Sequence, residues 1–109
     1  MYIDDCLVGT KKIFNSNLTD VYNLGSSEQV SINQLIDIIE KIADYKVNRK
    51  YLLDKPKGVR GRSSDNNKIQ LDLGWEPSIK LLDGLTKTYQ WIDEQIKSGE
   101  NTLKFTKSY

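Results

Sequence analysis

The feature that most constrains the fold is a run of apolar residues that recur at helical spacing between residues 31 and 44. Acidic and basic residues occupy the intervening positions, which places them on the opposite side of a helix. Ser31 and Gln34 are the residue pair of a capping box, the signature of a helix start. The pattern predicts an amphipathic helix that must pack its apolar side against another element. The apolar positions are Ile32, Leu35, Ile36, Ile39, Ile42 and Ala43.

Three more segments are predicted to be helical. The first covers about residues 4–14 and has two acids at its start, where negative charge complements the helix dipole. The second is short, from residue 66 to residue 73, and Gly74 suits the left-handed position that ends a helix. The third follows Pro77, which resets the backbone, and covers about residues 81–97.

Short runs rich in β-branched and aromatic residues separate these helices. Residues 21–25 resemble a buried strand, residues 47–53 alternate as a second strand, and residues 1–3 resemble the tail of another. We therefore predict a small mixed α/β lobe with short strands and three to four helices. Residues 1–98 are predicted to form this one lobe, and residues 99–109 a polar C-terminal tail.

A basic loop connects the second predicted strand to the short helix. Its glycines allow positive φ or a close approach to a ligand, and Ser63, Ser64 or Asp65 could cap the helix that follows. A helix N-terminus and a guanidinium group both suit phosphate oxygens, so we predict a phosphate-binding loop in which Arg62 makes the main contact. The alternative is a solvated surface loop, which is common for basic Gly/Ser segments. The cations are Lys55, Lys57, Arg60 and Arg62.

The charge balance and the missing residue types limit the possible functions. The 16 basic and 15 acidic residues leave a net charge of +1, which argues against a nucleic-acid or membrane-surface binder. His is absent, which removes the usual base of Ser and Cys hydrolases and a ligand set for zinc. The single Cys6 is interpreted as a packing residue in a protein of the reducing cytoplasm. No apolar run has the length of a membrane span.

Several motifs carry a resemblance in their order and spacing. They are Tyr2-Ile3-Asp4-Asp5, Tyr22-Asn23-Leu24-Gly25-Ser26, Arg62-Ser63-Ser64-Asp65 and Leu73-Gly74-Trp75-Glu76-Pro77. Together they resemble the C-terminal part of extended short-chain dehydrogenase/reductases that act on nucleotide sugars, the NAD-dependent epimerase/dehydratase family. The similarity covers about residues 2–97. Within that family, Gly-Val-Arg-Gly-Arg at 58–62 looks most like the loop of the GDP-mannose 3,5-epimerases.

The resemblance implies that two domains of the complete enzymes have different roles. Such enzymes hold NAD in an N-terminal Rossmann domain, oxidise a sugar carbon and return the hydride, while the C-terminal lobe clamps a nucleotide diphosphate-sugar. Carried over, Arg62 pairs with a phosphate of a GDP-sugar, and Arg60 is the second choice. Asp65 either accepts a hydrogen bond from a ribose hydroxyl or only caps the helix. Ser108 lies at a place comparable to that of a family tail serine that reaches the substrate.

The chain departs from the family pattern in the parts that carry the chemistry. The glycine fingerprint for NAD, a Tyr-x-x-x-Lys pair serving hydride transfer, and the upstream Cys and Lys used as acid and base are not matched. We therefore predict a substrate-binding lobe without its Rossmann domain, which has no catalytic or metal residues and binds no NAD alone. The alternative is a free-standing module that binds a nucleotide diphosphate or docks onto a Rossmann-domain subunit, with an apolar patch available for a homodimer. RNA binding is disfavoured because no aromatic platform accompanies the loop.

Overall fold

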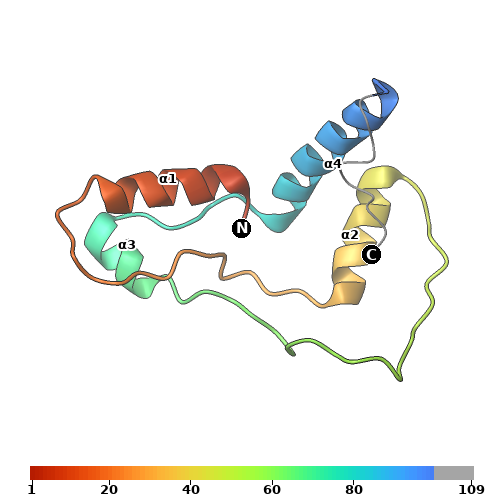
Figure 1. Cartoon of the computed structure of the whole chain (residues 1–109), viewed down its shortest axis with the longest axis horizontal. Coiled ribbons are helices and arrows are strands. Elements are labelled where there is room, and N and C mark those ends of the chain that lie inside the picture. Colours follow the sequence, from red (N-terminus) through yellow and green to blue (C-terminus); the bar gives the residue numbers. More distant parts are fainter. Residues whose placement is uncertain (100–109) are drawn as a thin grey trace.

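The computed structural model describes residues 1–99, and the four helices expected from the sequence are present in it. Figure 1 shows them in two pairs joined by long connections, with α1 beside α3 at one end and α2 against α4 at the other. No helix in this described part is long and apolar enough to cross a bilayer. The helices are α1 (Ile3–Phe14), α2 (Ile32–Ala43), α3 (Asn67–Leu73) and α4 (Leu81–Lys97).

The prediction of a mixed α/β lobe is wrong. The described part of the chain contains no strand, and segments 21–25 and 47–53 follow an irregular path instead of joining a sheet. Their composition suits strands, but a strand forms only where backbone N–H and C=O groups pair in series with a neighbour. The bond from Ser64 N–H to Ser26 O, at 2.9 Å, is of this kind but does not continue into a ladder. In the described part of the chain these segments therefore have the composition of strands but no neighbouring segment that pairs with them in series.

Local signals predicted most helix ends correctly. At α2, Gln34 N–H donates to Ser31 Oγ at 3.2 Å, and Ser31 N–H donates to Gln34 Oε1 at 2.7 Å, which confirms the capping box. Gly74 ends α3 with a φ of 59°, the left-handed conformation expected there. The exception is α1, which begins at Ile3, inside the segment expected to be the tail of a strand.

Two contacts join α1 to the connection between α3 and α4. Gly9 is buried, and a Cβ at this position would lie 2.6 Å from the Trp75 ring, so the close approach requires glycine. Near the start of α1, the buried Asp5 carboxylate accepts hydrogen bonds from the backbone N–H groups of Ser78 (3.0 Å) and Ile79 (2.8 Å). The connection between α3 and α4 is thereby tied to α1.

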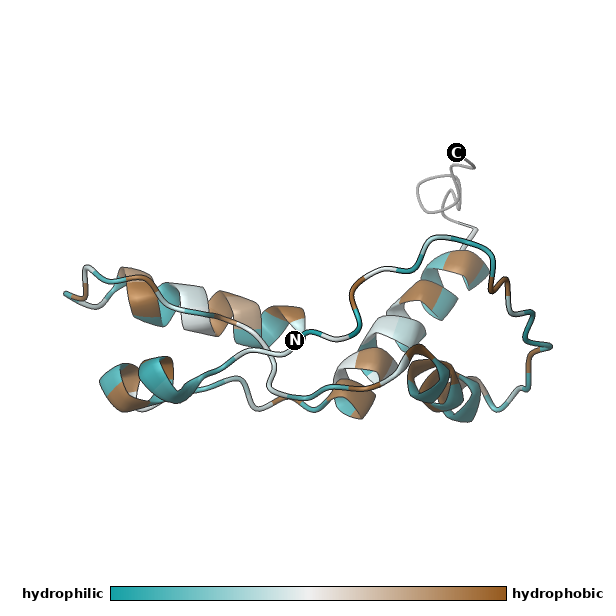
Figure 2. Cartoon of the chain, turned by 90° about the horizontal axis from the view of Figure 1, so that it is seen from below, coloured by the Kyte–Doolittle hydropathy of each residue, from teal (hydrophilic) through white to brown (hydrophobic). Residues whose placement is uncertain are grey.

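The four helices do not enclose a full hydrophobic core. The radius of gyration is 17.4 Å, whereas a compact chain of this length has about 13 Å. Among the described apolar residues only Ile69 is fully buried, while Phe14 is 86% exposed. Figure 2 shows apolar residues on each of the helices. Exposed apolar surface of this extent is typical of a polypeptide that packs against another domain or chain.

Candidate functional site

The loop that carries Arg62 borders an open hollow on the surface. Arg62 and the two serines that follow it form one side, and the segment from Asn23 to Ser26 forms the other. Met1 and Glu28 complete the rim. The hollow has a volume of about 670 Å³, which is within the range of ligand sites in proteins. Because Arg62 is exposed, its guanidinium group is accessible to a ligand.

Two hydrogen bonds join the two sides of this hollow. We call these two bonds and the close packing beside them the Gly25–Asn66 clamp. Ser64 N–H donates to Ser26 O at 2.9 Å, and Asn66 Nδ2 donates to Gly25 O at 3.0 Å. Asn66 is 5% exposed, so its amide is shielded from competing water. The packing is close, since a Cβ on Gly25 would lie 2.9 Å from Ser64 Cβ. The hollow is therefore built by segments that are 41 residues apart at this contact.

Polar side chains of α3 hold the chain that leads into the same hollow. Lys68 forms an ion pair with Asp20 and donates to Val21 O at 3.2 Å. Tyr22 Oη donates to Asp72 Oδ2 at 2.7 Å. The hydrogen bond to this carboxylate favours the neutral phenol and raises the pKa of Tyr22 to about 12. Together these contacts fix the residues just before Asn23–Ser26 against α3.

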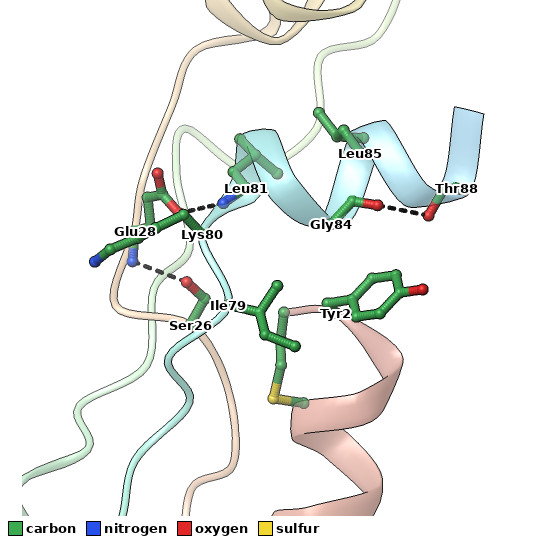
Figure 3. Close-up of a pocket in the computed structure, with 10 residues that line it drawn as sticks. Tyr2, Ser26, Glu28, Ile79, Lys80, Leu81, Gly84, Leu85 and Thr88 are labelled. Atoms are coloured by element: carbon green, nitrogen blue, oxygen red, sulfur yellow. Dashed lines mark hydrogen bonds between the residues drawn. The ribbon is translucent and has the colours of Figure 1, made fainter. Parts of the chain in front are cut away.

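A smaller and more enclosed pocket, drawn in Figure 3, shares Met1, Ser26 and Glu28 with the hollow. Its volume is about 140 Å³, and Tyr2 and Gly84 are among the residues that line it. Glu28 Oε2 accepts a hydrogen bond from Leu81 N–H at 2.8 Å, so this carboxylate caps the start of α4 from 53 residues away. Sequence reasoning missed Glu28 because a capping box is recognised only at a spacing of three residues.

The buried carboxylate of Glu40 on α2 does not border the hollow. It accepts hydrogen bonds from Lys46 Nζ at 2.8 Å, Val47 N–H at 3.1 Å and the Arg49 guanidinium at 2.7 Å. The bond from Lys46, followed by that from Val47, lowers the pKa of Glu40 to about 2. Arg49 also donates to Asp37 at 2.6 Å. Because these charges are paired with one another, we assign the cluster a structural role in fixing the chain after α2.

Comparisons with known proteins indicate the family of the chain. No protein-family model matches it. Over 96 residues, 88% of its length, it is 43% identical to GDP-mannose 3,5-epimerase 1 of Oryza sativa subsp. indica and 40% identical to GDP-mannose 3,5-epimerase of Arabidopsis thaliana. Over 97 residues it is 35% identical to UDP-glucuronate 4-epimerase of Thermodesulfobacterium geofontis. The chain belongs to the NAD-dependent epimerase/dehydratase family.

The chain spans only part of the length of these relatives. It covers 25% of the length of the rice and Arabidopsis enzymes and 30% of that of the Thermodesulfobacterium enzyme. The resemblance expected from the sequence motifs is confirmed, including the similarity to GDP-mannose 3,5-epimerases. The part of this chain that aligns with the relatives includes both sides of the hollow.

The site residues that the family resemblance implied differ in their position relative to the hollow. Arg62 borders the hollow, whereas Arg60, also exposed, is not among the lining residues. Asp65 Oδ1 accepts a hydrogen bond from Asn67 N–H at 3.0 Å, which is a local turn just before α3, whose N-cap residue is Asn66. Ser108 lies outside the described residues. The roles of these residues toward a substrate stay predictions.

The expected contribution of a helix N-terminus to anion binding is not supported. Helix α3 has only seven residues, and the Asp65 carboxylate already occupies its first N–H group. A negative charge at this place opposes a phosphate. Neither Gly58 nor Gly61 has a positive φ, and Gly61 packs against the side chain of Gln29. Among the residues that line the hollow, the guanidinium of Arg62 is the basic side chain left for an anion.

The expectation that the chain lacks a Tyr-x-x-x-Lys pair is wrong for the spacing alone, because Tyr51 and Lys55 have it. Both residues lie in an irregular segment, where a spacing of four does not fix the side chains on a common helix face. Tyr51 Oη donates to Asn33 Oδ1 at 3.1 Å, and Lys55 pairs with Asp54 at 3.6 Å. In the described part, no strand leads into a glycine-rich turn of the kind that holds a dinucleotide. The side chains of Tyr51 and Lys55 therefore contact different residues and do not form a pair with each other.

Proposed function

We propose that this chain is the part of an NAD-dependent nucleotide-sugar epimerase that binds the diphosphate of the substrate, with a GDP-sugar as the preferred ligand. The observation that carries the proposal is the position of Arg62 on a hollow of ligand size, in a segment 40–43% identical to GDP-mannose 3,5-epimerases. In this proposal residues 1–98 form the binding lobe of a cytoplasmic enzyme. The lobe is not catalytic by itself, and NAD, the acid and the base belong to the rest of a full-length relative.

The chemistry of Arg62 suits this role. A guanidinium group is planar and permanently charged, and its two parallel N–H groups match two phosphate oxygens. The open hollow leaves water around this contact, which weakens the attraction between the charges. A domain that closes over the hollow excludes that water, so the same contact becomes stronger in a complete enzyme. Weak binding by this chain alone is therefore expected.

A second role, docking onto another protein surface, is favoured by the exposed apolar residues. Leu7 and Phe14 on α1 and Ile96 on α4 are among them, although a chain of this size normally buries such side chains. We propose that an NAD-binding domain covers these faces, either within a full-length enzyme or as a separate subunit. A homodimer through the same faces is the competing arrangement.

Titration of the ¹⁵N-labelled chain with GDP, followed by NMR, tests the binding role. Chemical-shift changes are expected at residues 62–64 and 23–26, with a Kd on the order of 1 mM. Arg62→Ala should weaken binding about tenfold or more, because hydrogen bonds between charged groups contribute about 1.5–3 kcal/mol. Guanosine, which has no phosphate, should leave the signals of residues 62–64 unchanged.

Arg60→Ala is the matched control, because it removes the same charge from the same loop at a position that does not line the hollow. It should change the affinity for GDP by less than about twofold, as expected for an exposed charge. If Arg60→Ala and Arg62→Ala weaken binding equally, the loop attracts anions only through its overall charge, and the assignment of Arg62 is wrong.

Co-expression tests the docking role. The chain is produced together with the remaining three quarters of the Arabidopsis enzyme as a separate polypeptide. Copurification of the two, with epimerase activity that neither shows alone, is the expected result. A chain that forms homodimers in sedimentation experiments but does not bind the other polypeptide contradicts docking onto an NAD-binding domain.

A further inference from the structure

Arg62 lies near the end of a long stretch without regular structure, residues 45–66, which joins α2 to α3 (Figure 1). From Lys55 to Ser63 the only hydrogen bond in the described chain is local, between Lys55 N–H and Leu52 O. An arginine on such a segment has no fixed position unless its neighbours are anchored. Whether Arg62 has a fixed position therefore depends on the hydrogen bonds of the residues next to it.

The Gly25–Asn66 clamp supplies that anchor. Its two hydrogen bonds, from Ser64 N–H and Asn66 Nδ2, follow Arg62 within four residues and end on the opposite side of the hollow, at Ser26 and Gly25. The clamp thus joins the residues that carry the guanidinium to the residues that face it across the hollow. Its loss would release one side of the hollow from the other.

The environment of Asn66 shows that the residue is not there for packing alone. It is 5% exposed, yet its Oδ1 has no hydrogen-bond partner within the described residues. An unpaired buried amide oxygen is unfavourable, so an apolar side chain would serve better as a filler. What Asn66 provides in return is the Nδ2 donor to Gly25 O, which no apolar residue can supply.

We propose that Asn66 is the positioning residue for Arg62: through the clamp it fixes the side of the hollow that carries the guanidinium, and it sets the affinity for a diphosphate without contacting it. This inference rests on the proposed function of Arg62. Without the clamp, the ligand must order Arg62 and its neighbours when it binds. Ordering one long side chain weakens binding by about three- to tenfold, which is the effect expected here.

Two substitutions at Asn66 test the inference. Asn66→Ala removes the donor. Asn66→Asp keeps the shape but places a carboxylate against Gly25 O at neutral pH, whereas the protonated carboxyl at low pH can again donate. The expected result is weaker GDP binding by both variants at pH 7, with recovery of the Asp variant, relative to wild type at the same pH, as the pH falls. Asn48→Ala, at an exposed position, is the matched control.

A ligand-free measurement accompanies the titrations. The heteronuclear ¹⁵N NOE of residues 61–64 should fall in both Asn66 variants at pH 7, which reports greater backbone mobility, and should stay at the wild-type value in Asn48→Ala. If Asn66→Ala does not fold, Gly25→Ala replaces it. Its Cβ, 2.9 Å from Ser64 Cβ, forces the two sides apart and leaves both hydrogen-bond donors in place.

The outcomes separate the inference from the function on which it rests. Unchanged NOE values and unchanged GDP affinity in the Asn66 variants overturn the positioning role. A loss of affinity in Asn66→Asp that does not recover at low pH also overturns it, because the donated hydrogen bond is then not the cause. If the NOE values fall as expected but wild type does not bind GDP, the clamp is correct and the diphosphate function is wrong.

Discussion

Replacing Asp5 with alanine tests the main contact between α1 and the chain that precedes α4. The Asp5 carboxylate is 6% exposed and accepts the N–H groups of Ser78 at 3.0 Å and Ile79 at 2.8 Å. Alanine offers no acceptor, so both N–H groups lose their partner while α1 itself can still form. The variant should therefore lower the free energy of unfolding without changing the helix content of the folded state.

The size of the effect follows from the two hydrogen bonds. A buried N–H group that loses its acceptor costs about 1–3 kcal/mol, so two such groups give about 2–6 kcal/mol. Ser78 is exposed, and water can replace part of the loss there. We therefore expect the free energy of unfolding to decrease by about 2–4 kcal/mol, the lower part of the range of about 2–6 kcal/mol. This is a large share of a typical stability of about 5–15 kcal/mol.

Urea denaturation followed by circular dichroism measures the change, and Asp4→Ala is the matched control. Asp4 adjoins Asp5 in the first turn of α1, so both substitutions remove the same charge from the helix dipole. Asp4 is exposed, however, and its Oδ2 lies 3.9 Å from Lys87 Nζ, a surface pair that contributes about 0–1 kcal/mol. Hydrogen exchange provides a local readout, because the amides of Ser78 and Ile79 should exchange faster in Asp5→Ala alone.

Equal destabilisation by the two substitutions would refute the reasoning, since the helix dipole would then account for the whole effect. Unchanged exchange of the Ser78 and Ile79 amides in Asp5→Ala would refute it independently. That second result would mean that these amides do not depend on the carboxylate in solution.

Three further predictions concern stability. Gly9→Ala should lower the free energy of unfolding by about 1–3 kcal/mol through overpacking, because a Cβ there would lie 2.5 Å from Leu24 Cδ1. Urea denaturation measures the change, and Gly58→Ala is the control because position 58 has open space around it. The pKa of Glu40 is about 2 instead of 4.5, so its contribution to stability is complete above pH 4.5 and is lost as the pH falls toward 2. Thermal unfolding of wild type and Glu40→Gln over that pH range should show a shallower pH dependence in the variant. Ser31→Ala removes the side-chain half of the capping box and should cost about 1 kcal/mol in the same urea assay.

The helices could be predicted because the information for them is local. The capping box at Ser31 and Gln34 and the glycine at position 74 act within one helical turn, and the apolar spacing of α2 and α4 is visible in any window of a dozen residues. The family could be recognised for a related reason, since its motifs are short runs of adjacent residues. Both inferences require no knowledge of how distant segments meet.

The strands and most site geometry could not be predicted, because they depend on distant partners. Segments 21–25 and 47–53 have strand composition, but in the described chain no neighbour pairs with them in series. Asp65 illustrates the same limit within the site. Its sequence position allowed either a ribose contact or a helix cap, and only the structure shows its carboxylate on Asn67 N–H.

The sequence by itself therefore determined the four helices, the capping box of α2, the glycine that ends α3 and the membership in the epimerase/dehydratase family. Only the tertiary structure decided which polar groups meet across the chain: Asp5 with Ser78, 73 residues apart, Glu28 with Leu81, 53 apart, and Asn66 with Gly25, 41 apart. The physical reason is that a helix satisfies its backbone within one turn, whereas a carboxylate or amide that caps a remote segment is indistinguishable in sequence from one that faces water.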